Sequence, residues 1–337
     1  MKYALGLDQG RTKTFAAIAD LDGNILSVGG AGGGHHYLTG MEHATGQMRS
    51  AASAAFGRIG GMQGDIAAIG GGLAGADLPH DCQALKEGVE KTFSCPAVVV
   101  NDCIIALRAE TRERSSLIIC AGTGLNVGVW APDGSQDVLG YYIDELWHGG
   151  EAIGRRTLFV VMESALGVRD ETMLTQKLLD FYGLPDVLTL REKWVKEEIE
   201  CEKIKDFAIE VGSCAAAGDQ VCIRLLEEFA HAWAGYAIAG MKRNGMLDKP
   251  TAVYTSGSIF KSATDVLLEA LKRKLRAANP QVRIADSMYE PIVGGVILAL
   301  EKALGGKVSD KILQNVYASA RTNGLLRNEK SIERIGE

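Results

Sequence analysis

The sequence predicts an α/β protein that is built from two domains. The chain has 337 residues, which is too long for one ordinary core and suits two domains of roughly 100–200 residues each. Strand-like and helix-like patterns alternate along it, and a similar polar turn appears between two apolar strands in each half, at residues 8–14 and 120–126. In such folds ligands bind at the carboxyl ends of strands.

The first domain is expected to open with three strands, Tyr3–Leu7, Phe15–Ala19 and Ile25–Val28. The sequence Asp22-Gly23-Asn24 between the last two is a strong hairpin signal. The following elements are expected to be a helix at Glu42–Ile59, a strand at Ile66–Ile69, a helix at Asp81–Thr92, a strand at Ala97–Val100 and a helix at Ile104–Glu110.

The charged run Arg108–Arg114 breaks the composition and makes a plausible domain boundary. Beyond it we expect strands at Ser116–Cys120 and Asn126–Trp130, a mostly helical region at Glu151–Asn244 with an exposed charged helix at Arg191–Asp206, a strand at Ala252–Thr255, a helix at Ile259–Ala277, a strand at Val282–Ala285 and a helix at Ile292–Ala303. We place the first domain at 1–113, joined by a C-terminal helix at about 304–330, and the second at 114–303 with a helical insertion.

Composition excludes several classes of protein. The net charge of −6 argues against nucleic-acid binding as the main activity. The seven cysteines are scattered and form no CxxC pair, which favours free thiols and a reducing, cytoplasmic location over disulfides or a zinc site. Because the N-terminus resembles no signal peptide and no apolar run reaches about 18 residues, we expect neither export nor a membrane partner.

The two polar turns are candidates for phosphate binding. The first lies between two strands, so it is neither a Walker A loop nor a dinucleotide fingerprint, both of which open a helix. Its backbone N–H groups and hydroxyls could still face phosphate oxygens, while Asp8 could hold hydrated magnesium. An ordinary polar hairpin explains this turn about equally well. The candidate contacts are Gly10, Arg11, Thr12, Lys13 and Thr14 in the first turn and Gly122, Thr123 and Gly124 in the second.

Two further positions follow apolar strands directly. Asp102, after Asn101, is a candidate general base for a substrate hydroxyl, although a helix N-cap is the commoner role for an aspartate there. Gly257-Ser258 precedes a helical segment and would let a planar ring or a phosphate approach the backbone closely. A simple cap by Ser258 is equally plausible.

These segments together resemble the BadF/BadG/BcrA/BcrD-type ATPase and N-acetylglucosamine kinase family of the sugar kinase–Hsp70–actin superfamily. The similar motifs, in family order, are Asp8–Thr14, Gly72–Asp77, Asn101-Asp102, Gly122–Gly124, Ile153–Arg156, Ser256–Phe260 and Pro291–Leu300. The sequence departs from the family at Gln9 and Arg11, where glycines are usual, at Ser258, and at Ile143–Trp147, which only partly matches a Gly-Asp-Glu-Gly-Ser segment.

The resemblance implies a two-domain actin-like, ribonuclease H-like ATPase fold with the nucleotide in the interdomain cleft. It implies a cytoplasmic, homodimeric kinase that uses ATP and Mg²⁺ to phosphorylate an amino sugar such as N-acetylglucosamine. By the same resemblance, Asp102 is the catalytic base, Asp8 holds the metal through water, and Gly257 and Ser258 contact adenosine. The expected sugar contacts are His35, His36, Asn101, Asp144 and Glu145.

Two other functions remain open on the sequence. One is an ATP-driven activator of 2-hydroxyacyl-CoA dehydratases, which would need suitably placed cysteines for a shared iron–sulfur cluster. The other is a non-catalytic sugar sensor on a kinase scaffold, which the changed segments at Gln9, Arg11 and Ile143–Trp147 motivate. For His35 and His36, a solvated loop is the alternative to sugar binding.

Overall fold

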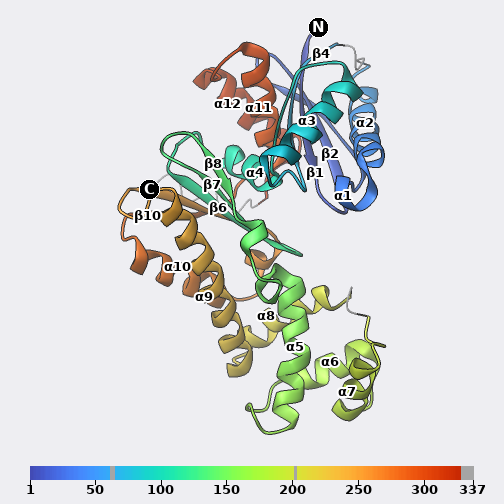
Figure 1. Cartoon of the computed structure of the whole chain (residues 1–337), viewed down its shortest axis with the longest axis vertical. Coiled ribbons are helices and arrows are strands. Elements are labelled where there is room, and N and C mark those ends of the chain that lie inside the picture. Colours follow the sequence, from blue (N-terminus) through green and yellow to red (C-terminus); the bar gives the residue numbers. More distant parts are fainter. Residues whose placement is uncertain (61–64, 201–202, 328–337) are drawn as a thin grey trace. The chain divides into compact units, whose positions relative to one another are not determined.

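The computed structural model describes residues 1–60, 65–200 and 203–327. The chain divides into two compact units (Figure 1). Unit 1 comprises residues 1–118, 128–138 and those from 285 onward, and unit 2 comprises residues 119–127 and 139–284. The domain boundaries predicted after residues 113 and 303 stay a prediction.

A five-stranded mixed sheet with the order β3-β2-β1-β4-β5 forms the centre of unit 1. Its strands are β1 (Tyr3–Gln9), β2 (Lys13–Asp20), β3 (Ile25–Gly32), β4 (Ile66–Leu73) and β5 (Ala97–Val100). The three opening strands run antiparallel, as the hairpin signals predict, whereas β4 pairs in parallel with β1 and with β5. Asp8 lies opposite Gly72, and Gly72 lies opposite Val100. The carboxyl ends of three parallel strands therefore meet at one edge.

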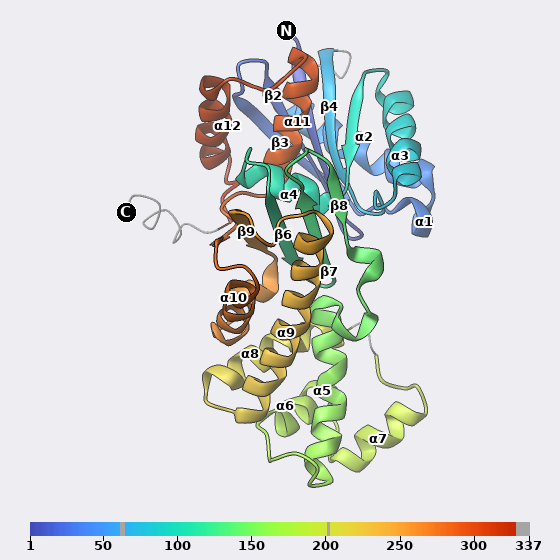
Figure 2. The same ribbon diagram turned by 60° about the vertical axis from the view of Figure 1, so that its left-hand side comes forward.

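Helices cover both faces of this sheet because successive strand residues point to opposite sides. Leu5 and Leu7 pack with α2 (Met41–Gly57) and α3 (Pro79–Phe93), whereas Ala4 faces α11 (Ile292–Leu304) and α12 (Asp310–Thr322). Figure 2 shows the two pairs of helices on opposite sides. Helix α4 (Asp102–Glu110) packs against α11.

Glycines allow α11 to lie unusually close to the sheet. A Cβ atom on Gly6 of β1 would lie 2.7 Å from the backbone nitrogen of Val296, and one on Gly70 of β4 would lie 2.2 Å from the carbonyl oxygen of Gly295. Real Cβ atoms do not approach backbone atoms so closely. Gly6 and Gly70 are thus required for the packing of α11 against the sheet.

The outer strand β3 exchanges hydrogen bonds with side chains of α12 and of Asn323, the residue that follows it. The backbone N–H of Ile25 donates to Ser319 Oγ at 2.8 Å, and Asn323 Nδ2 donates to the carbonyl oxygen of Ile25 at 2.9 Å. Asn315 Nδ2 donates to the carbonyl oxygen of Asp22, in the turn before β3, at 2.8 Å. Side chains of the last helix thus satisfy backbone groups at the sheet edge.

The second five-stranded sheet has the order β10-β9-β6-β7-β8. Its strands are β6 (Ser116–Ala121), β7 (Leu125–Trp130), β8 (Gln136–Val138), β9 (Thr251–Ser256) and β10 (Val282–Asp286). The helices of unit 2 are α5 (Gly149–Ala165), α6 (Leu174–Tyr182), α7 (Val187–Val195), α8 (Ala208–Ala216), α9 (Gln220–Arg243) and α10 (Val266–Ala278). Short 3₁₀ turns lie at Gly140–Tyr142, Glu145–Trp147, Ile204–Phe207 and Ser258–Lys261.

Two helix predictions need correction. The helix expected at Ile259–Ala277 is split into the 3₁₀ turn Ser258–Lys261 and α10, and the Thr264 hydroxyl between them accepts a hydrogen bond from the backbone of Val266. The charged helix expected at Arg191–Asp206 ends with α7 at Val195, because Glu197 has a left-handed backbone with φ of 57°. Residues 201–202 of that segment lie outside the described part of the chain.

Helix apolarity and cysteine burial concern two of the predictions made from composition. Within the described segments, no helix combines the length and the apolarity needed to span a bilayer. The described cysteines are free and at least half-buried.

Candidate active site

The aligned strand ends of unit 1 bring several polar side chains together. Asp8 is the next-to-last residue of β1, and Asn101-Asp102 follows β5 directly. Asn101 is the N-cap of α4, because its Oδ1 accepts the backbone N–H of Cys103 at 2.9 Å. Asp102 Oδ1 accepts the same N–H at 2.9 Å. The capping role suggested for the aspartate therefore belongs mainly to Asn101, and Asp102 is half-buried with a second carboxylate oxygen left for other partners.

Asp77 is a residue at this edge that the sequence analysis did not propose as part of the site. Asn101 Nδ2 donates to Asp77 Oδ1 at 2.6 Å. Asp77 lies in the segment after β4, so this bond joins two strand-end loops that are 24 residues apart. It fixes the amide of Asn101, and it could have been suspected from the Gly72–Asp77 motif.

Burial and mutual repulsion raise the pKa values of the carboxylates at this edge. Burial, followed by the nearby Asp102 carboxylate, raises the pKa of Asp8 to about 7. Burial raises the pKa of Asp102 as well, and burial followed by Asp102 raises the pKa of Asp77 to about 6. A cation bound here would relieve this crowding.

Magnesium fits this chemistry, since it is a hard cation that prefers oxygen ligands and keeps several waters. The described residues contain no group of three or more His, Cys, Asp or Glu side chains able to enclose a metal ion. A Mg²⁺ ion held by Asp8 would therefore complete its coordination shell with water and phosphate oxygens.

His35 and His36 lie beside this edge and have unused nitrogen atoms. His36 begins the short helix α1 (His36–Thr39). The two imidazole rings are stacked, with centroids 5.8 Å apart, and Gly75 lies against both. Within the described residues, the Nδ1 atoms of both histidines are buried without a hydrogen-bond partner. Because buried polar atoms are normally paired, these two are suited to a ligand.

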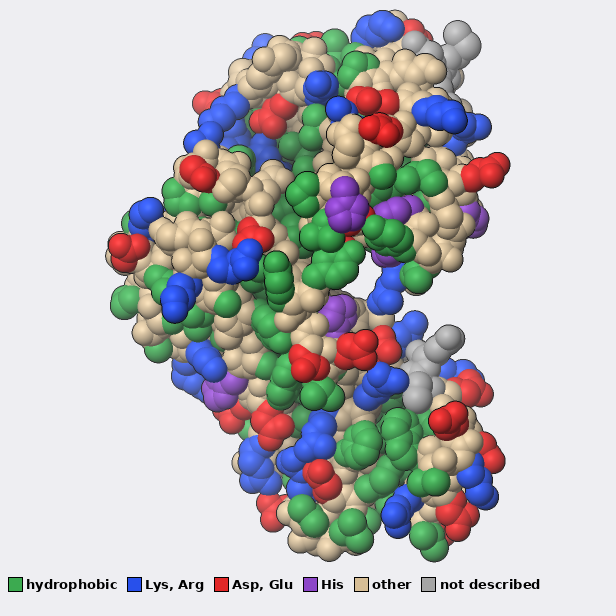
Figure 3. All heavy atoms as spheres, viewed as in Figure 1, with side chains coloured by type: hydrophobic (Ala, Val, Ile, Leu, Met, Phe, Trp, Pro, Cys, Tyr) green, Lys and Arg blue, Asp and Glu red, His purple; other side chains and the backbone are tan. Residues whose placement is uncertain are grey.

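Asp81 anchors the histidine segment and was predicted only as the start of a helix. Its carboxylate is 1% exposed and accepts a short hydrogen bond from the Tyr37 hydroxyl. His36 Nε2 lies 3.9 Å and His80 Nε2 3.3 Å from Asp81 Oδ1. Burial is the main reason that the pKa values of His35 and His36 are lowered. Figure 3 shows histidine and apolar side chains gathered on this part of unit 1.

Buried side chains hold the first candidate phosphate turn in place. Gln9 is 1% exposed, and its Nε2 donates to Thr14 Oγ1 at 3.0 Å and to the carbonyl oxygen of Ala44 at 2.9 Å. Thr14 is fully buried, and its hydroxyl donates to the carbonyl oxygen of Gly32 at 2.7 Å. The Gln9 side chain therefore points into the core, away from a phosphate. Arg11, Thr12 and Lys13 are exposed and Gly10 is half-buried.

Backbone packing holds the second turn, at Gly122–Gly124 in unit 2. The N–H groups of Gly150 and Glu151, in the first turn of α5, donate to the carbonyl oxygens of Gly122 and Thr123 at 2.8 and 3.1 Å. Gly149 has a φ of 68°, and a Cβ atom there would lie 2.3 Å from the Gly124 carbonyl oxygen.

The Gly257-Ser258 turn packs against Ala121, which directly precedes the second turn. Gly257 has a φ of 115°, and a Cβ atom on it would lie 2.1 Å from the Ala121 carbonyl oxygen. Only glycine suits such a conformation and contact. Ser258 is exposed and begins a 3₁₀ turn. The two turns predicted to bind nucleotide in the second half of the sequence are therefore neighbours.

Asp144 and Glu145 lie elsewhere in unit 2, on an exposed segment. Asp144 Oδ1 accepts the backbone N–H of Leu146 at 2.9 Å, so this aspartate caps a 3₁₀ turn. Trp233, which is fully buried in α9, donates from Nε1 to the carbonyl oxygen of Trp147 at 2.8 Å and stacks edge-on with Phe260. This tryptophan ties the segment to the Gly257-Ser258 turn. Sugar binding by Asp144 and Glu145 stays a prediction.

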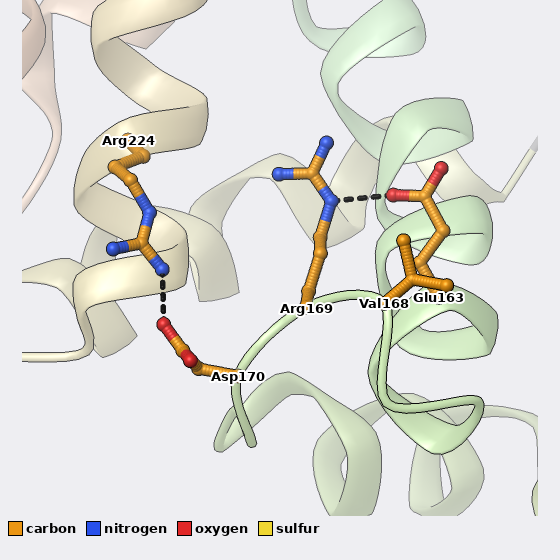
Figure 4. A pocket seen from close by; sticks show the side chains of 5 residues that line it. All are labelled: Glu163, Val168, Arg169, Asp170 and Arg224. Carbon is orange, nitrogen blue, oxygen red and sulfur yellow. Dashed lines mark hydrogen bonds and ion pairs between the residues drawn. The ribbon is translucent and has the colours of Figure 1, made fainter.

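A separate hollow in unit 2 has a volume of about 370 Å³ and is lined by Glu163, Val168, Arg169, Asp170 and Arg224. Figure 4 shows two ion pairs in it, Arg169 with Glu163 and Arg224 with Asp170 at 2.7 Å. Its charged side chains therefore neutralise one another, and it holds none of the predicted site residues.

Known proteins resemble this chain over most of its length. The model of the BadF/BadG/BcrA/BcrD ATPase family matches residues 5–299. An N-acetylmuramic acid/N-acetylglucosamine kinase from Clostridium acetobutylicum is 25% identical over 306 residues, which cover 89% of this chain and 98% of the relative.

Solved structures share the fold at low sequence identity. A putative N-acetylglucosamine kinase from Chromobacterium violaceum superimposes with a TM-score of 0.68 at 21% identity, covering 89% of this chain and 99% of the other. A ROK family glucokinase from Streptomyces griseus, in complex with glucose and AMPPNP, gives 0.53 at 20% identity, covering 90% and 100%. The two mixed five-stranded sheets with their helices are thus those of the actin-like ATPase fold, as predicted.

Proposed function

Because the chain belongs to the BadF/BadG/BcrA/BcrD ATPase family, we propose that it is an ATP-dependent kinase that phosphorylates an amino sugar such as N-acetylglucosamine. The observation that carries this proposal is the position of Asp102 at the end of β5, on the strand edge shared with Asp8 and beside the Asn101–Asp77 hydrogen bond. A base, a metal-binding carboxylate and a fixed amide at one edge suit transfer of a phosphoryl group to a hydroxyl.

In the proposed reaction, Asp102 accepts the proton of a sugar hydroxyl. The oxygen then forms a bond to the γ-phosphorus of ATP, the bond from that phosphorus to the β–γ bridging oxygen breaks, and ADP leaves. Mg²⁺ held through Asp8 would neutralise charge on the phosphates. We assign phosphate contacts to Gly10–Lys13 and Gly122–Gly124, and adenosine contacts to Gly257 and Ser258. Thr14, the remaining residue of the predicted ATP contacts, is left out because its hydroxyl is buried and donates to the Gly32 carbonyl oxygen.

We assign the sugar to His35, His36 and Asn101. The unpartnered Nδ1 atoms of the two histidines support this, because each can donate or accept one hydrogen bond with a hydroxyl or an acetamido group. The relative from Clostridium acetobutylicum acts on N-acetylated sugars by its name, which favours the acetamido group.

An ADP-release assay over amino sugars, neutral sugars and no sugar tests the proposal. We expect turnover that depends on an amino sugar. Asp102→Asn should lower kcat by about 10²–10⁴-fold while ATP still binds, and Asp248→Asn, an exposed control, should behave as wild type. Near-normal turnover by Asp102→Asn would exclude the base assignment, and equal turnover without sugar would exclude the kinase.

The assay also has a pH signature. Burial raises the pKa of Asp102, and only its carboxylate form accepts a proton. We therefore expect kcat to fall as the pH drops through that raised pKa, at a higher pH than an ordinary aspartate would give. A flat acid limb would contradict Asp102 as the base.

The activator alternative finds less support. Burial is the first cause that raises the pKa values of Cys82, Cys95, Cys214 and Cys222, with that of Cys95 at about 11. Thiolates, which bind iron–sulfur clusters, are therefore disfavoured at these positions. The free thiols of the described cysteines support the cytoplasm as the proposed location.

A homodimer through the helical part of unit 2 is also proposed. Leu188 and Val195, seven residues apart on one face of α7, are 65% and 70% exposed, and Ile209 of α8 is 70% exposed. Figure 3 shows a group of hydrophobic side chains over this region. Light scattering should give twice the chain mass, and Leu188→Glu with Val195→Glu should give a monomer. A wild-type monomer would contradict the proposal.

A further inference from the structure

Arg11 occupies a turn whose backbone has little freedom to move. The N–H of Gly10 donates to the Lys13 carbonyl oxygen at 2.9 Å, and the N–H of Gly34 donates to the Gly10 carbonyl oxygen at 3.1 Å. A Cβ atom on Gly33 would lie 2.1 Å from the carbonyl oxygen of Arg11. With Gln9 anchored in the core on the preceding strand, the position of the Arg11 backbone is determined from several sides.

The Arg11 side chain is exposed, and its guanidinium has no hydrogen-bond or ion-pair partner among the residues that the structure describes. Its charge nevertheless acts on two site residues from separate segments. Burial raises the pKa of Asp102, and Arg11 opposes that rise. Burial and the neighbouring His36 lower the pKa of His35, and Arg11 lowers it further. Because the N–H of Gly34 donates to the Gly10 carbonyl oxygen, the turn that carries Arg11 lies next to His35, and the Arg11 charge reaches both His35 and Asp102.

This location is where negative charge would develop during transfer. Asp8, Asp77 and Asp102 already crowd the strand edge with carboxylates, which would repel a phosphoryl group. In phosphoryl transfer the charge spreads over the three equatorial oxygens of the moving group, and cations that contact those oxygens accelerate the reaction. Arg presents a planar fork of donors that matches such oxygens.

We propose that Arg11 is a catalytic residue whose guanidinium contacts the phosphoryl group during its transfer to the sugar. The inference rests on the proposed kinase function. It assigns to Arg11 a role beyond that of a ground-state ATP contact, at a position where the family usually has glycine. Because the contact strengthens as charge develops, it acts mainly on kcat.

The test compares Arg11→Ala, Arg11→Gly and Arg11→Lys with wild type under saturating ATP and sugar. We expect the first two to lower kcat about 100-fold, while the KM values for ATP and sugar change by less than about fivefold. Arg11→Lys should retain part of the activity, since lysine keeps the charge but loses the fork. Arg58→Ala, a matched loss of an exposed arginine in unit 1, should leave kcat unchanged.

Chemical rescue separates catalysis from structure. Added guanidinium chloride at millimolar, non-denaturing concentration should restore kcat of Arg11→Ala several-fold and leave Arg58→Ala unaffected. The thermal midpoints of the Arg11 variants should match wild type because the side chain is exposed.

Three results would overturn the inference. The first is that the wild type is active and Arg11→Ala has the same kcat. The second is a variant with a raised KM for ATP alone, which would make Arg11 a ground-state phosphate contact. The third is a defect confined to acidic sugars, which would make Arg11 a substrate contact. A wild type without sugar-dependent turnover would instead refute the proposed function, and this inference with it.

Discussion

The two candidate phosphate turns resemble each other in sequence but are held in place by different means. In unit 1, buried polar side chains fix the turn, with Gln9 and Thr14 hydrogen-bonded in the core, and the charged side chains Arg11 and Lys13 project outward. In unit 2, glycines pack backbone against backbone, and the turn presents no charged side chain of its own. The first turn can therefore offer charge as well as backbone N–H groups, whereas the second offers backbone and a hydroxyl.

Among substitutions that test this difference, we expect the largest loss of stability beside the second turn, at Gly149. Gly149→Ala should lower the free energy of unfolding by about 3 kcal/mol or more, because the new Cβ meets both a φ of 68° and a backbone atom 2.3 Å away. ATP affinity should fall with it, since Gly149 is packed against Gly124. Thermal unfolding and isothermal titration with ATP measure the two effects.

Gly167→Ala is the matched control for that variant. Gly167 has a similar φ of 74° but nothing within 4 Å of a new Cβ, so it carries only the conformational cost of about 1–2 kcal/mol. If both glycine variants lost the same stability, close backbone packing would not be what holds the second turn.

A smaller loss of stability is expected at the first turn. Gln9→Ala removes two buried hydrogen bonds and should cost about 1–3 kcal/mol. The KM for ATP should rise several-fold and kcat should fall in part as the turn loosens, because Gln9 also helps to fix the position of Arg11. Gln83→Ala, which removes one exposed hydrogen bond to Glu87, should change stability by less than about 0.5 kcal/mol. An unaltered stability of Gln9→Ala would show that the turn does not depend on side-chain anchoring.

Much of this architecture could be predicted from local sequence. The hairpins at the N-terminus, the alternation of strands and helices and the two turns follow from apolar periodicity and from Gly, Asn and Asp signals. The split of the helix expected at Ile259–Ala277 was missed, because its apolar period continues across the break while Thr264 offers the backbone a competing hydrogen bond. The end of helix α7 at Val195 was missed for a related reason. The charged residues of this segment favour a helix but do not determine where it ends.

The site was predictable only in part. Strand ends identify Asp8, Asn101 and Asp102, because parallel strands align their carboxyl ends. The pairs Asp77–Asn101 and Tyr37–Asp81 depend on contacts between residues 24 and 44 positions apart, which no local pattern encodes. The inward orientation of Gln9 likewise depends on Ala44, 35 positions away.

The hydrogen bonds between the α12 region and the outer strand β3 affect how the chain behaves while it is being synthesised. Ile25 is synthesised early, whereas its partners Ser319 and Asn323 are made almost 300 residues later. Until they are made, the backbone groups of Ile25 at the start of this edge are open to pairing with another chain, which is a known route to aggregation. Nascent or truncated chains that stop before residue 310 should therefore self-associate through this edge, and the last helix acts as the cap that ends this vulnerable period.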